Sequence, residues 1–568
     1  MLRVILFILP ALLFPACAVF NPPPKTDNAT ADIRLNQVGF YPDAPKKAVV
    51  AVAGAGDRFA VVSEADGKKV FEGKLSQTLT WPLAGETVRI ADFSGLRMPG
   101  RYALYVEGAG YSYPFSIADN ILNAPLRAAV KSFYYQRAGF ALEEKYAGQW
   151  ARPAGHPDQE VMFHPSTGRS GMTVSNKGWY DAGDYGKYVV NGAFSLGQML
   201  FLHEQYPEIL PDGALHIPES GNGVSDLLDE LKYEMDWLLQ MQDEDGGAFF
   251  KLTTLKFGGM KLPHELKLQR YIIGKGTAPS LNLAAVAAKM SRAYAKIDPE
   301  YAQTCRQAAL RAWEWAVAHP DRPYKNPEDV KTGEYSDADF SGEFFWAAAE
   351  LYVATKNEKY LPYLEKNMSD FEFRENESWA NFTNFLGAFT LLNHAPELPL
   401  TAGVRNKLLK TAEILAAQTA GNDYFQPVDA FFWGSNSDVL NAAMILATAY
   451  RMDPKPVFLT ATRETTDYVF GKNANAQCFL TGYGNRSPMH IHHRPSAADG
   501  IDAPVPGFVV GGPNYGKQDA PAVVYPENAP PMKCWVDVQP SFASNEVCLN
   551  WNAPLVYVLG FLEAQGKR

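Results

Sequence analysis

The chain has 568 residues, a formal net charge of −10, and 47% hydrophobic and 20% charged residues. It is too long for one ordinary hydrophobic core, so we expect two or three domains of a soluble protein. The acidic balance argues against nucleic acids and anionic membranes as partners. Aromatic residues make up 13% of the chain, which favours a protein that stacks rings on a ligand as well as packing them in its core.

Residues 1–18 have the pattern of an export signal. Arg3 precedes an apolar run from Val4 to Leu13, which is short for a membrane span. Two interpretations fit the Ala-Cys-Ala sequence around Cys17: a cleavage site for secretion, or a cysteine whose lipid anchors a bacterial lipoprotein. In both cases we expect an exported protein that is secreted, periplasmic or lipid-anchored at the cell surface. Residues 19–31 follow as a flexible tether.

Residues 32–118 are predicted to form a small all-β sandwich, because short β-rich runs alternate with Gly, Asp and Pro turns. The expected strands are residues 48–53, 59–63, 69–75, 86–93, 101–107 and 111–117.

Residues 124–566 are predicted to form one helical domain. In the segment Val224–Leu239 apolar side chains recur at helical spacing while charged ones occupy the other faces. Similar patterns predict helices at residues 126–137, 193–204, 281–295, 344–354, 404–419, 439–450 and 555–564. Loops rich in Gly, Pro and Asn join them, and such loops commonly carry functional residues.

Beyond Cys17, the cysteines Cys305, Cys478, Cys534 and Cys548 have no Cys-x-x-Cys spacing and no histidine at ligand spacing, so no zinc site is expected. A disulfide from Cys478 to Cys534 or Cys548 is an alternative. We expect buried free thiols.

The first candidate for chemistry is the stretch Gly178–Tyr188, in which Asp181 and Asp184 flank an Ala-Gly pair among aromatic residues. The glycine permits a tight turn that aims both carboxylates at one small volume, where they would grip a water molecule. Carboxylates for proton transfer beside flat rings are what a sugar site needs. A solvated loop or an Asp-rich calcium turn is the alternative.

The second candidate is the run His490-Ile491-His492-His493-Arg494. Adjacent imidazoles cannot comfortably share one metal ion, and the arginine would repel it. A cluster that hydrogen-bonds hydroxyl groups is therefore the better interpretation, and no metal is predicted here.

The third candidate is Glu546, which lies among apolar and aromatic residues just before the last helix. Desolvation raises the pKa of a carboxyl group, so Glu546 is a candidate proton donor near neutral pH. The alternative is a glutamate that stabilises the helix N-terminus.

Taken together, these motifs resemble glycoside hydrolase family 9, the endoglucanase-type cellulases. The resemblance covers nearly the whole mature chain and implies a mainly α fold, an (α/α)6 barrel preceded by an Ig-like sandwich. The matching segments are Ile33–Phe40, Phe133–Arg137, Gly178–Tyr185, Asp226–Glu230, Gly511–Asn514, His492–Arg494, Asp537, Glu546 and Asn552-Ala553.

The resemblance implies a role for each matching position. Asp184 would be the general base, Asp181 would hold the attacking water, and Glu546 would be the general acid of an inverting mechanism, which separates acid and base by roughly 6.5–9.5 Å. The resemblance also implies substrate binding by His492 and Arg494, with Asp537 supporting the acid loop. Candidate stacking platforms are Trp179, Tyr180, Trp433 and Trp551.

Some features depart from the family. The zinc-binding Cys/His set of some members is not visible, and Cys548 stands where a smaller residue is usual. No cofactor is expected for catalysis. Structural Ca²⁺ is common in the family, and the acidic loop Asp337–Glu343 is the candidate place for it. No carbohydrate-binding module, dockerin or Ser/Pro-rich linker is recognised after the barrel.

The sequence therefore predicts a monomeric, exported, endo-acting β-1,4-glucanase for cellulose-type or soluble β-glucans. Alternatives are an exo-acting cellobiosidase, β-glucosidase or exo-glucosaminidase, and a xyloglucan-specific endoglucanase. A catalytically dead glycan-binding protein is disfavoured by the intact acids, and a phosphorylase would lack the second carboxylate as base.

Overall fold

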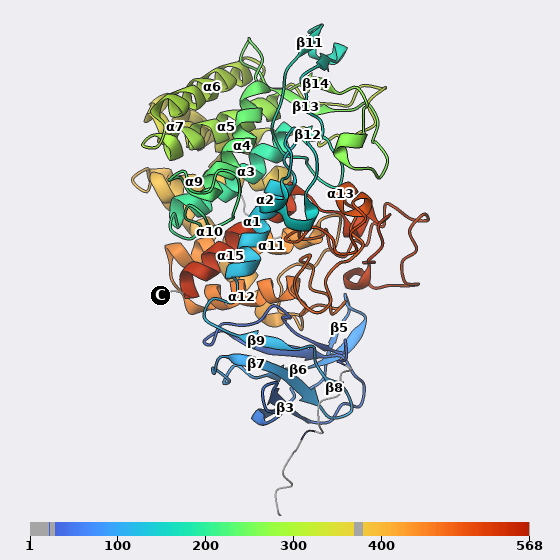
Figure 1. Ribbon diagram of the computed structural model, residues 1–568. Coiled ribbons are helices and arrows are strands. Elements are labelled where there is room, and N and C mark those ends of the chain that lie inside the picture. Colours follow the sequence, from blue (N-terminus) through green and yellow to red (C-terminus); the bar gives the residue numbers. More distant parts are fainter. Residues whose placement is uncertain (1–21, 23–28, 369–378, 567–568) are drawn as a thin grey trace, which may run out of the picture.

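The computed structural model describes residue 22 and residues 29–368 and 379–566. The expected signal segment and Cys17 lie outside the described residues. A small β-sandwich adjoins a large helical domain, and the two are distinct in Figure 1. No helix within the described residues is long and apolar enough to cross a membrane.

The N-terminal part is the expected Ig-like sandwich. One sheet has the strand order β1 (Ile33–Arg34), β2 (Lys47–Val50), β6 (Glu86–Asp92), β5 (Leu79–Trp81). The other has the order β4 (Lys69–Lys74), β3 (Arg58–Ser63), β7 (Gly100–Val106), β8 (Gly110–Tyr111). Strand β9 (Phe115–Ile117) also pairs with β7. Phe59, Leu104 and Phe115 belong to the core of the sandwich. Ala29 and Thr30, at the end of the expected tether, already pair with Tyr111.

The helical domain is the expected (α/α)6 barrel. Its inner helices are α3 (Val189–Gln205), α5 (Thr277–Tyr294), α7 (Ser341–Thr355), α9 (Trp379–His394), α11 (Ser435–Met452) and α15 (Leu549–Gly566); its outer helices are α1 (Asn123–Tyr135), α4 (Asp226–Gln240), α6 (Pro299–Ala318), α8 (Leu361–Met368), α10 (Pro399–Gly421) and α12 (Pro456–Val469). Inner helices such as α3 and α15 are apolar and buried almost all round, whereas outer helices such as α4 are amphipathic, as two concentric layers require.

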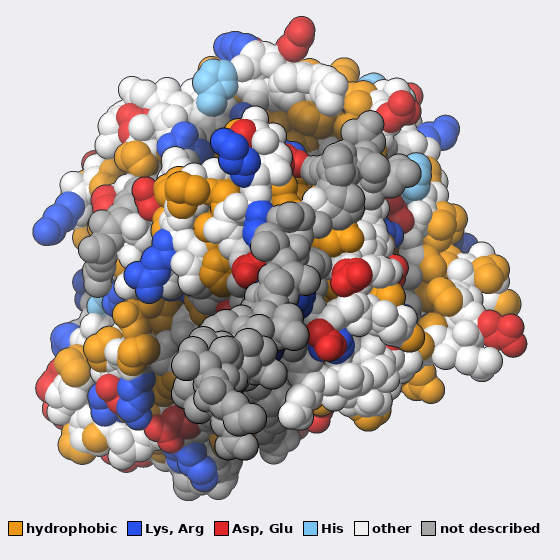
Figure 2. Space-filling view, turned by 90° about the horizontal axis from the view of Figure 1, so that it is seen from below, with side chains coloured by type: hydrophobic (Ala, Val, Ile, Leu, Met, Phe, Trp, Pro, Cys, Tyr) orange, Lys and Arg blue, Asp and Glu red, His pale blue; other side chains and the backbone are white. Residues whose placement is uncertain are grey.

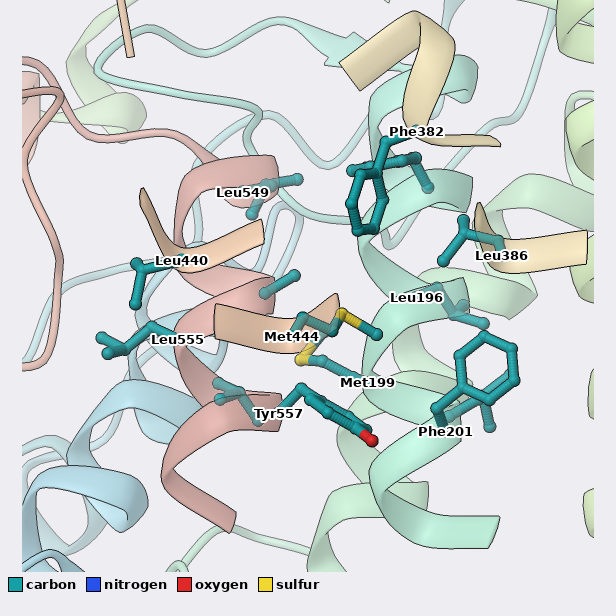
Figure 3. Packing of buried hydrophobic residues seen from close by; sticks show 14 of the residues in the cluster. Leu196, Met199, Phe201, Phe382, Leu386, Leu440, Met444, Leu549, Leu555 and Tyr557 are labelled. Atoms are coloured by element: carbon teal, nitrogen blue, oxygen red, sulfur yellow. The ribbon is translucent and has the colours of Figure 1, made fainter. Parts of the chain in front are cut away.

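The centre of the barrel is filled by side chains from facing inner helices. Figure 3 shows Met199 of α3, Met444 of α11 and Tyr557 of α15 turned toward one another, with Phe382 and Leu386 of α9 nearby. All five side chains are fully buried. The barrel axis is thus a packed core, so the site must lie in the loops at one end of it.

A five-stranded sheet that the sequence did not predict lies among these loops, in the order β11 (Met172–Thr173), β10 (Val161–Phe163), β14 (Tyr271–Lys275), β13 (Phe249–Thr253), β12 (Lys187–Tyr188). Strand β12 comes directly after the Asp181/Asp184 stretch and leads into α3. The sheet therefore fixes one end of that stretch.

The sandwich and the barrel are joined by buried polar contacts. Asn36 donates to Asp467 at 2.7 Å, and the hydroxyl of Tyr41 donates to Glu563 at 2.5 Å. The side chain of Gln37 accepts from the backbone N–H groups of Asn485 and Arg486, each at 2.9 Å. On the visible part of the face seen from the sandwich end (Figure 2), acidic and basic side chains are interspersed.

Candidate active site

The stretch Gly178–Tyr188 forms a tight turn held at both ends. Gly178 has a φ of +82°, which favours glycine. The N–H of Asp181 donates to the carbonyl of Gly186 at 2.9 Å, and the N–H of Gly186 donates back to Oδ2 of Asp184 at 2.8 Å. The second bond orients the Asp184 carboxylate.

Glu546 lies between α14 (Phe542–Asn545) and α15, and its backbone is extended, with φ −78° and ψ 163°. Isolated β-bridges connect Glu546 to His492 and Cys548 to Ala182. The N–H of Leu549 also donates to the carbonyl of Asp181 at 2.9 Å. The fold thus brings together three segments from opposite ends of the helical domain.

Gly183 is the point of closest approach between these segments. A Cβ placed there would collide with the carbonyl oxygen of His492 and would lie 3.1 Å from Oε1 of Glu546. The carbonyl of Gly183 accepts from both the N–H of Arg494, at 3.0 Å, and its Nη1, at 2.8 Å. A glycine is needed because the backbones leave no room for a side chain.

The acids have raised pKa values with identifiable causes. Burial, reinforced by the charge of Asp184, raises the pKa of Glu546 well above its usual range, against the opposing effect of Arg494. Burial and then the charge of Asp184 raise the pKa of Asp181 to about 7. The raised pKa of Glu546 favours its protonated form, which is the form that a general acid needs.

Asp181 is held by two side chains that the sequence reasoning missed. Asn191 donates to Oδ1 at 2.5 Å, and the hydroxyl of Tyr335 donates to Oδ2 at 2.6 Å. Tyr335 has a φ of +43°, a strained conformation for a tyrosine. No sequence motif marks either residue, because their role depends on the folding of α3 and of a distant loop against the turn.

His492 and Asp537 lie at this junction. Nδ1 of the His492 ring lies 2.9 Å from the carbonyl oxygen of Gln539. The backbone N–H of His492 donates to the carbonyl of Asn545. The carboxylate of Asp537 accepts from Asn545 and from the N–H groups of Met489 and His490, at 2.8–2.9 Å. These contacts connect the histidine run to the loop before Glu546.

The side chain of Arg494, expected to bind sugar hydroxyls, donates to two backbone carbonyls of the protein. Besides Gly183, its Nε donates to the carbonyl of Gly258 at 3.1 Å, and only 6% of the residue is exposed. His493 is fully buried and contacts Ser496 and Gln136. The two histidines thus point to different partners, and no cluster of three or more His, Cys, Asp or Glu able to hold a metal ion occurs among the described residues.

Of the aromatic candidates, Trp433 is 45% exposed and lies 5.5 Å, centroid to centroid, from Phe542, whose ring is 6.1 Å from that of His492. The expectation for Tyr180 needs correction, because its side chain is fully buried and its hydroxyl donates to the carbonyl of Gly155 at 3.1 Å. Trp179 is likewise buried. Trp551 is 9% exposed and packs against Gly511, so only Trp433 offers an open ring.

The cysteines agree with the expectation of free thiols: Cys305, Cys478, Cys534 and Cys548 are free and buried. Cys548 lies beside the site, where its sulfur is 3.3 Å from Nδ2 of Asn191. Burial raises the pKa of its thiol well above the usual range, so it acts as a packing group rather than a nucleophile.

A carboxyl group with a raised pKa beside two further acids, in the loops of a helical barrel, is the arrangement of a glycoside hydrolase. The model of glycosyl hydrolase family 9 matches residues 123–559, and that of the cellulase N-terminal ig-like domain matches residues 28–111. The chain belongs to glycosyl hydrolase family 9, as its motifs predicted.

Several relatives cover nearly all of the chain. It is 41% identical over 558 residues to the xyloglucan-specific endo-beta-1,4-glucanase BoGH9A of Bacteroides ovatus, with 94% of each chain covered. It is 34% identical to Endoglucanase D of Acetivibrio thermocellus, over 94% of this chain and 84% of that one. The structure of AaCel9A in complex with cellobiose-like isofagomine has a TM-score of 0.86 at 32% identity, with 94% of this chain and 100% of that chain covered.

Proposed function

We propose that the protein is an exported, inverting, endo-acting β-1,4-glucan hydrolase. The observation that carries the proposal is the position of Glu546, which lies against Gly183, where burial and the charge of Asp184 raise the pKa of its carboxyl group well above the usual range. An acid and a base of this kind on either side of a glycosidic bond are what hydrolysis needs.

Each acid has one task in this mechanism. Glu546 donates its proton to the leaving glycosidic oxygen as the bond breaks. Asp184, oriented by the N–H of Gly186, takes a proton from the water that attacks the opposite face of the sugar. Asp181, fixed by Asn191 and Tyr335, accepts the second hydrogen bond of that water. His492 lies at the junction beside Glu546, where it would bind sugar hydroxyls.

Endo action is supported by two exposed rings near the acids. The ring of Trp433 is 5.5 Å from that of Phe542, which is 6.1 Å from the ring of His492. Phe257, 49% exposed, has its ring centroid 5.6 Å from the guanidinium of Arg494. Two separate exposed rings suit a glucan chain longer than the two sugars at the cleaved bond. Xyloglucan is the second candidate substrate, favoured by the 41% identity to a relative named as xyloglucan-specific.

The test is product analysis on carboxymethyl-cellulose, barley β-glucan, xyloglucan and chito-oligosaccharides. We expect short oligosaccharides of mixed length from a β-glucan, with the α-anomer first in NMR spectra. Asp184→Ala and Glu546→Gln should each lower kcat by at least about 100-fold, while Glu358→Gln, the same change on the exposed outer surface, should not. Wild-type rates from either active-site variant would exclude this mechanism.

Export and the lipid anchor have a separate test. If Cys17 is acylated, the native protein will sediment with membranes and Cys17→Ser will release it. A soluble native protein would favour cleavage and secretion. We further propose a monomer, which size-exclusion chromatography with light scattering would measure directly.

A structural Ca²⁺ ion is proposed at residues 337–343, which run into the first turn of α7. Glu343 is 1% exposed, and burial together with the charge of Asp337 raises the pKa of its carboxyl group well above the usual range. Only these two acids would bind the ion, so its other ligands would be backbone carbonyls and water. Oxygen atoms of this kind are ligands that Ca²⁺ prefers. Adding Ca²⁺ to chelator-treated protein should raise its Tm, and Glu343→Gln should abolish that rise. A Tm that does not respond to Ca²⁺ would refute the site.

A further inference from the structure

Asp519 is a buried carboxylate in the loop between Asn514 and Tyr525, outside the residues that the proposed mechanism uses. Only 5% of it is exposed, whereas Tyr515 and Val524 of the same loop are 57% and 83% exposed. Burying a carboxylate is costly unless hydrogen bonds replace the water that it loses. The hydrogen-bond partners of Asp519 therefore show which part of the protein depends on it.

These partners lie in and beside α14, the short helix that ends at the residue before Glu546. Oδ2 of Asp519 accepts from the hydroxyl of Ser541 at 2.9 Å and from the backbone N–H of Ala543 at 3.0 Å. Oδ1 accepts from the hydroxyl of Tyr525 at 2.9 Å. The side chain of Ser541, the N-cap residue of α14, makes no capping bond, so Asp519 satisfies an N–H group that the helix itself leaves unpaired.

The other end of the segment is held by a different pair of residues. The N–H of Gly512 donates to the carbonyl of Ser544 at 3.0 Å, and the N–H of Gly511 donates to the carbonyl of Glu546 at 2.9 Å. The start of α14 is therefore anchored by Asp519, and its end by these two backbone groups.

A shift at the start of α14 would reach the general acid. The helix has only four residues, which is about one turn, and Glu546 follows Ala543 by three residues. One turn is too short to absorb a displacement along its length. A general acid must lie within hydrogen-bond reach of the atom that it protonates, and groups of this kind must be held within about 0.5 Å.

We propose that Asp519 is a positioning residue for the general acid: it fixes α14 and thereby holds the carboxyl group of Glu546 toward the leaving glycosidic oxygen. Its own carboxylate takes no part in the chemistry. The inference rests on the proposed hydrolase function, with Glu546 as the acid. It gives the loop of Asp519 an effect on the chemical step rather than on substrate binding.

The leaving group of the substrate separates this role from a general loss of stability. Cleavage of a β-glucan needs the proton of Glu546, whereas the leaving group of dinitrophenyl β-cellobioside is acidic enough to need little protonation. Asp519→Ala should lower kcat on barley β-glucan about tenfold or more with KM within about twofold, but should lower kcat on the dinitrophenyl substrate less than about threefold.

Two variants are compared with Asp519→Ala. Asp519→Asn keeps an oxygen acceptor for Ser541 and Ala543 and should recover most of the loss. Glu527→Ala changes an exposed acid further along the chain and is the matched control, which should leave both rates unchanged. Losses of equal size on the two substrates, or wild-type rates on both from Asp519→Ala, would overturn the positioning role.

The double variant tests whether the effect passes through the acid. Asp519→Ala added to Glu546→Gln should change the remaining kcat on β-glucan by less than about twofold, because the group that Asp519 positions is already lost. A full further loss would contradict the proposal. If the Asp519→Ala protein does not fold, Ser541→Ala, which removes one donor to the carboxylate, replaces it: a smaller loss confined to β-glucan supports the role, and an equal loss on both substrates or none refutes it.

The same measurements separate this inference from the proposed function. A Glu546→Gln protein as active on β-glucan as the wild type would refute the hydrolase mechanism itself. An inactive Glu546→Gln protein together with a fully active Asp519→Ala protein would leave that mechanism standing and refute only the positioning role.

Discussion

Gly183→Ala is the sharpest perturbation of the proposed site, because it adds one methyl group between the turn of Asp181 and Asp184 and the segments of His492 and Glu546. The new carbon would lie 3.0 Å from the carbonyl carbon of His492 and closer still to its oxygen. Carbon atoms pack at about 3.5–4.0 Å, and the oxygen of His492 is the nearest atom, so the backbones must separate by about 1 Å. That shift moves the Asp181/Asp184 turn away from Glu546.

The expected loss follows from this displacement. Catalytic groups must be held within about 0.5 Å of productive geometry, and a misplacement of about 1 Å costs on the order of 100-fold. We therefore expect kcat to fall between about tenfold and 100-fold, with about 1–3 kcal/mol less free energy of unfolding from overpacking.

The assay is initial-rate hydrolysis of a soluble β-glucan, together with denaturant unfolding. Gly421→Ala at the end of α10, where an added Cβ has nothing within 4 Å, is the control and should keep wild-type activity and stability. Wild-type kcat in a folded Gly183→Ala protein would refute the conclusion that this contact sets the distance between acid and base.

Three further perturbations probe the surroundings of the site. Burial and the charge of Asp184 raise the pKa of Asp181 to about 7, and the proposed mechanism needs its ionised form, so kcat/KM should rise as the pH passes that value. Tyr335→Phe removes a hydrogen-bond donor to the carboxylate, which raises the pKa of Asp181 further. The acidic limb of the pH profile should therefore move up by about one pH unit. The buried ammonium of Lys251 donates to Asn326 at 2.7 Å and to the carbonyl of Gly333 at 2.6 Å, and so holds the segment that carries Tyr335. Lys251→Met should therefore lower kcat/KM about tenfold; an unchanged value would show that other contacts hold the segment. Gln37→Ala leaves the N–H of Asn485 without its acceptor and should cost about 1–3 kcal/mol of unfolding free energy in a denaturant titration. Gln37→Glu should restore only part of this loss, because it keeps the acceptor oxygen but cannot donate to the carbonyl of Ala476.

Elements whose apolar residues recur on one face were predictable from the sequence. The pattern of residues 224–239 gave a helix that the structure places at Asp226–Gln240. Helix α6 was missed because its buried stripe is mostly alanine, whose small side chain gives a weak periodic signal. Strand β13 was missed because all five of its residues are buried, so no alternation distinguishes it.

The same division holds at the site. That Asp181, Asp184 and Glu546 are candidate acids was visible in the sequence, because local motifs mark them; their catalytic roles stay a prediction. The burial of Tyr180 and the bond from Tyr335 to Asp181 were decided only by the tertiary structure. The sequence specifies which side chains are available. Their exposure and their partners depend on which distant segments pack against them. That packing also sets the pKa values on which the chemistry depends.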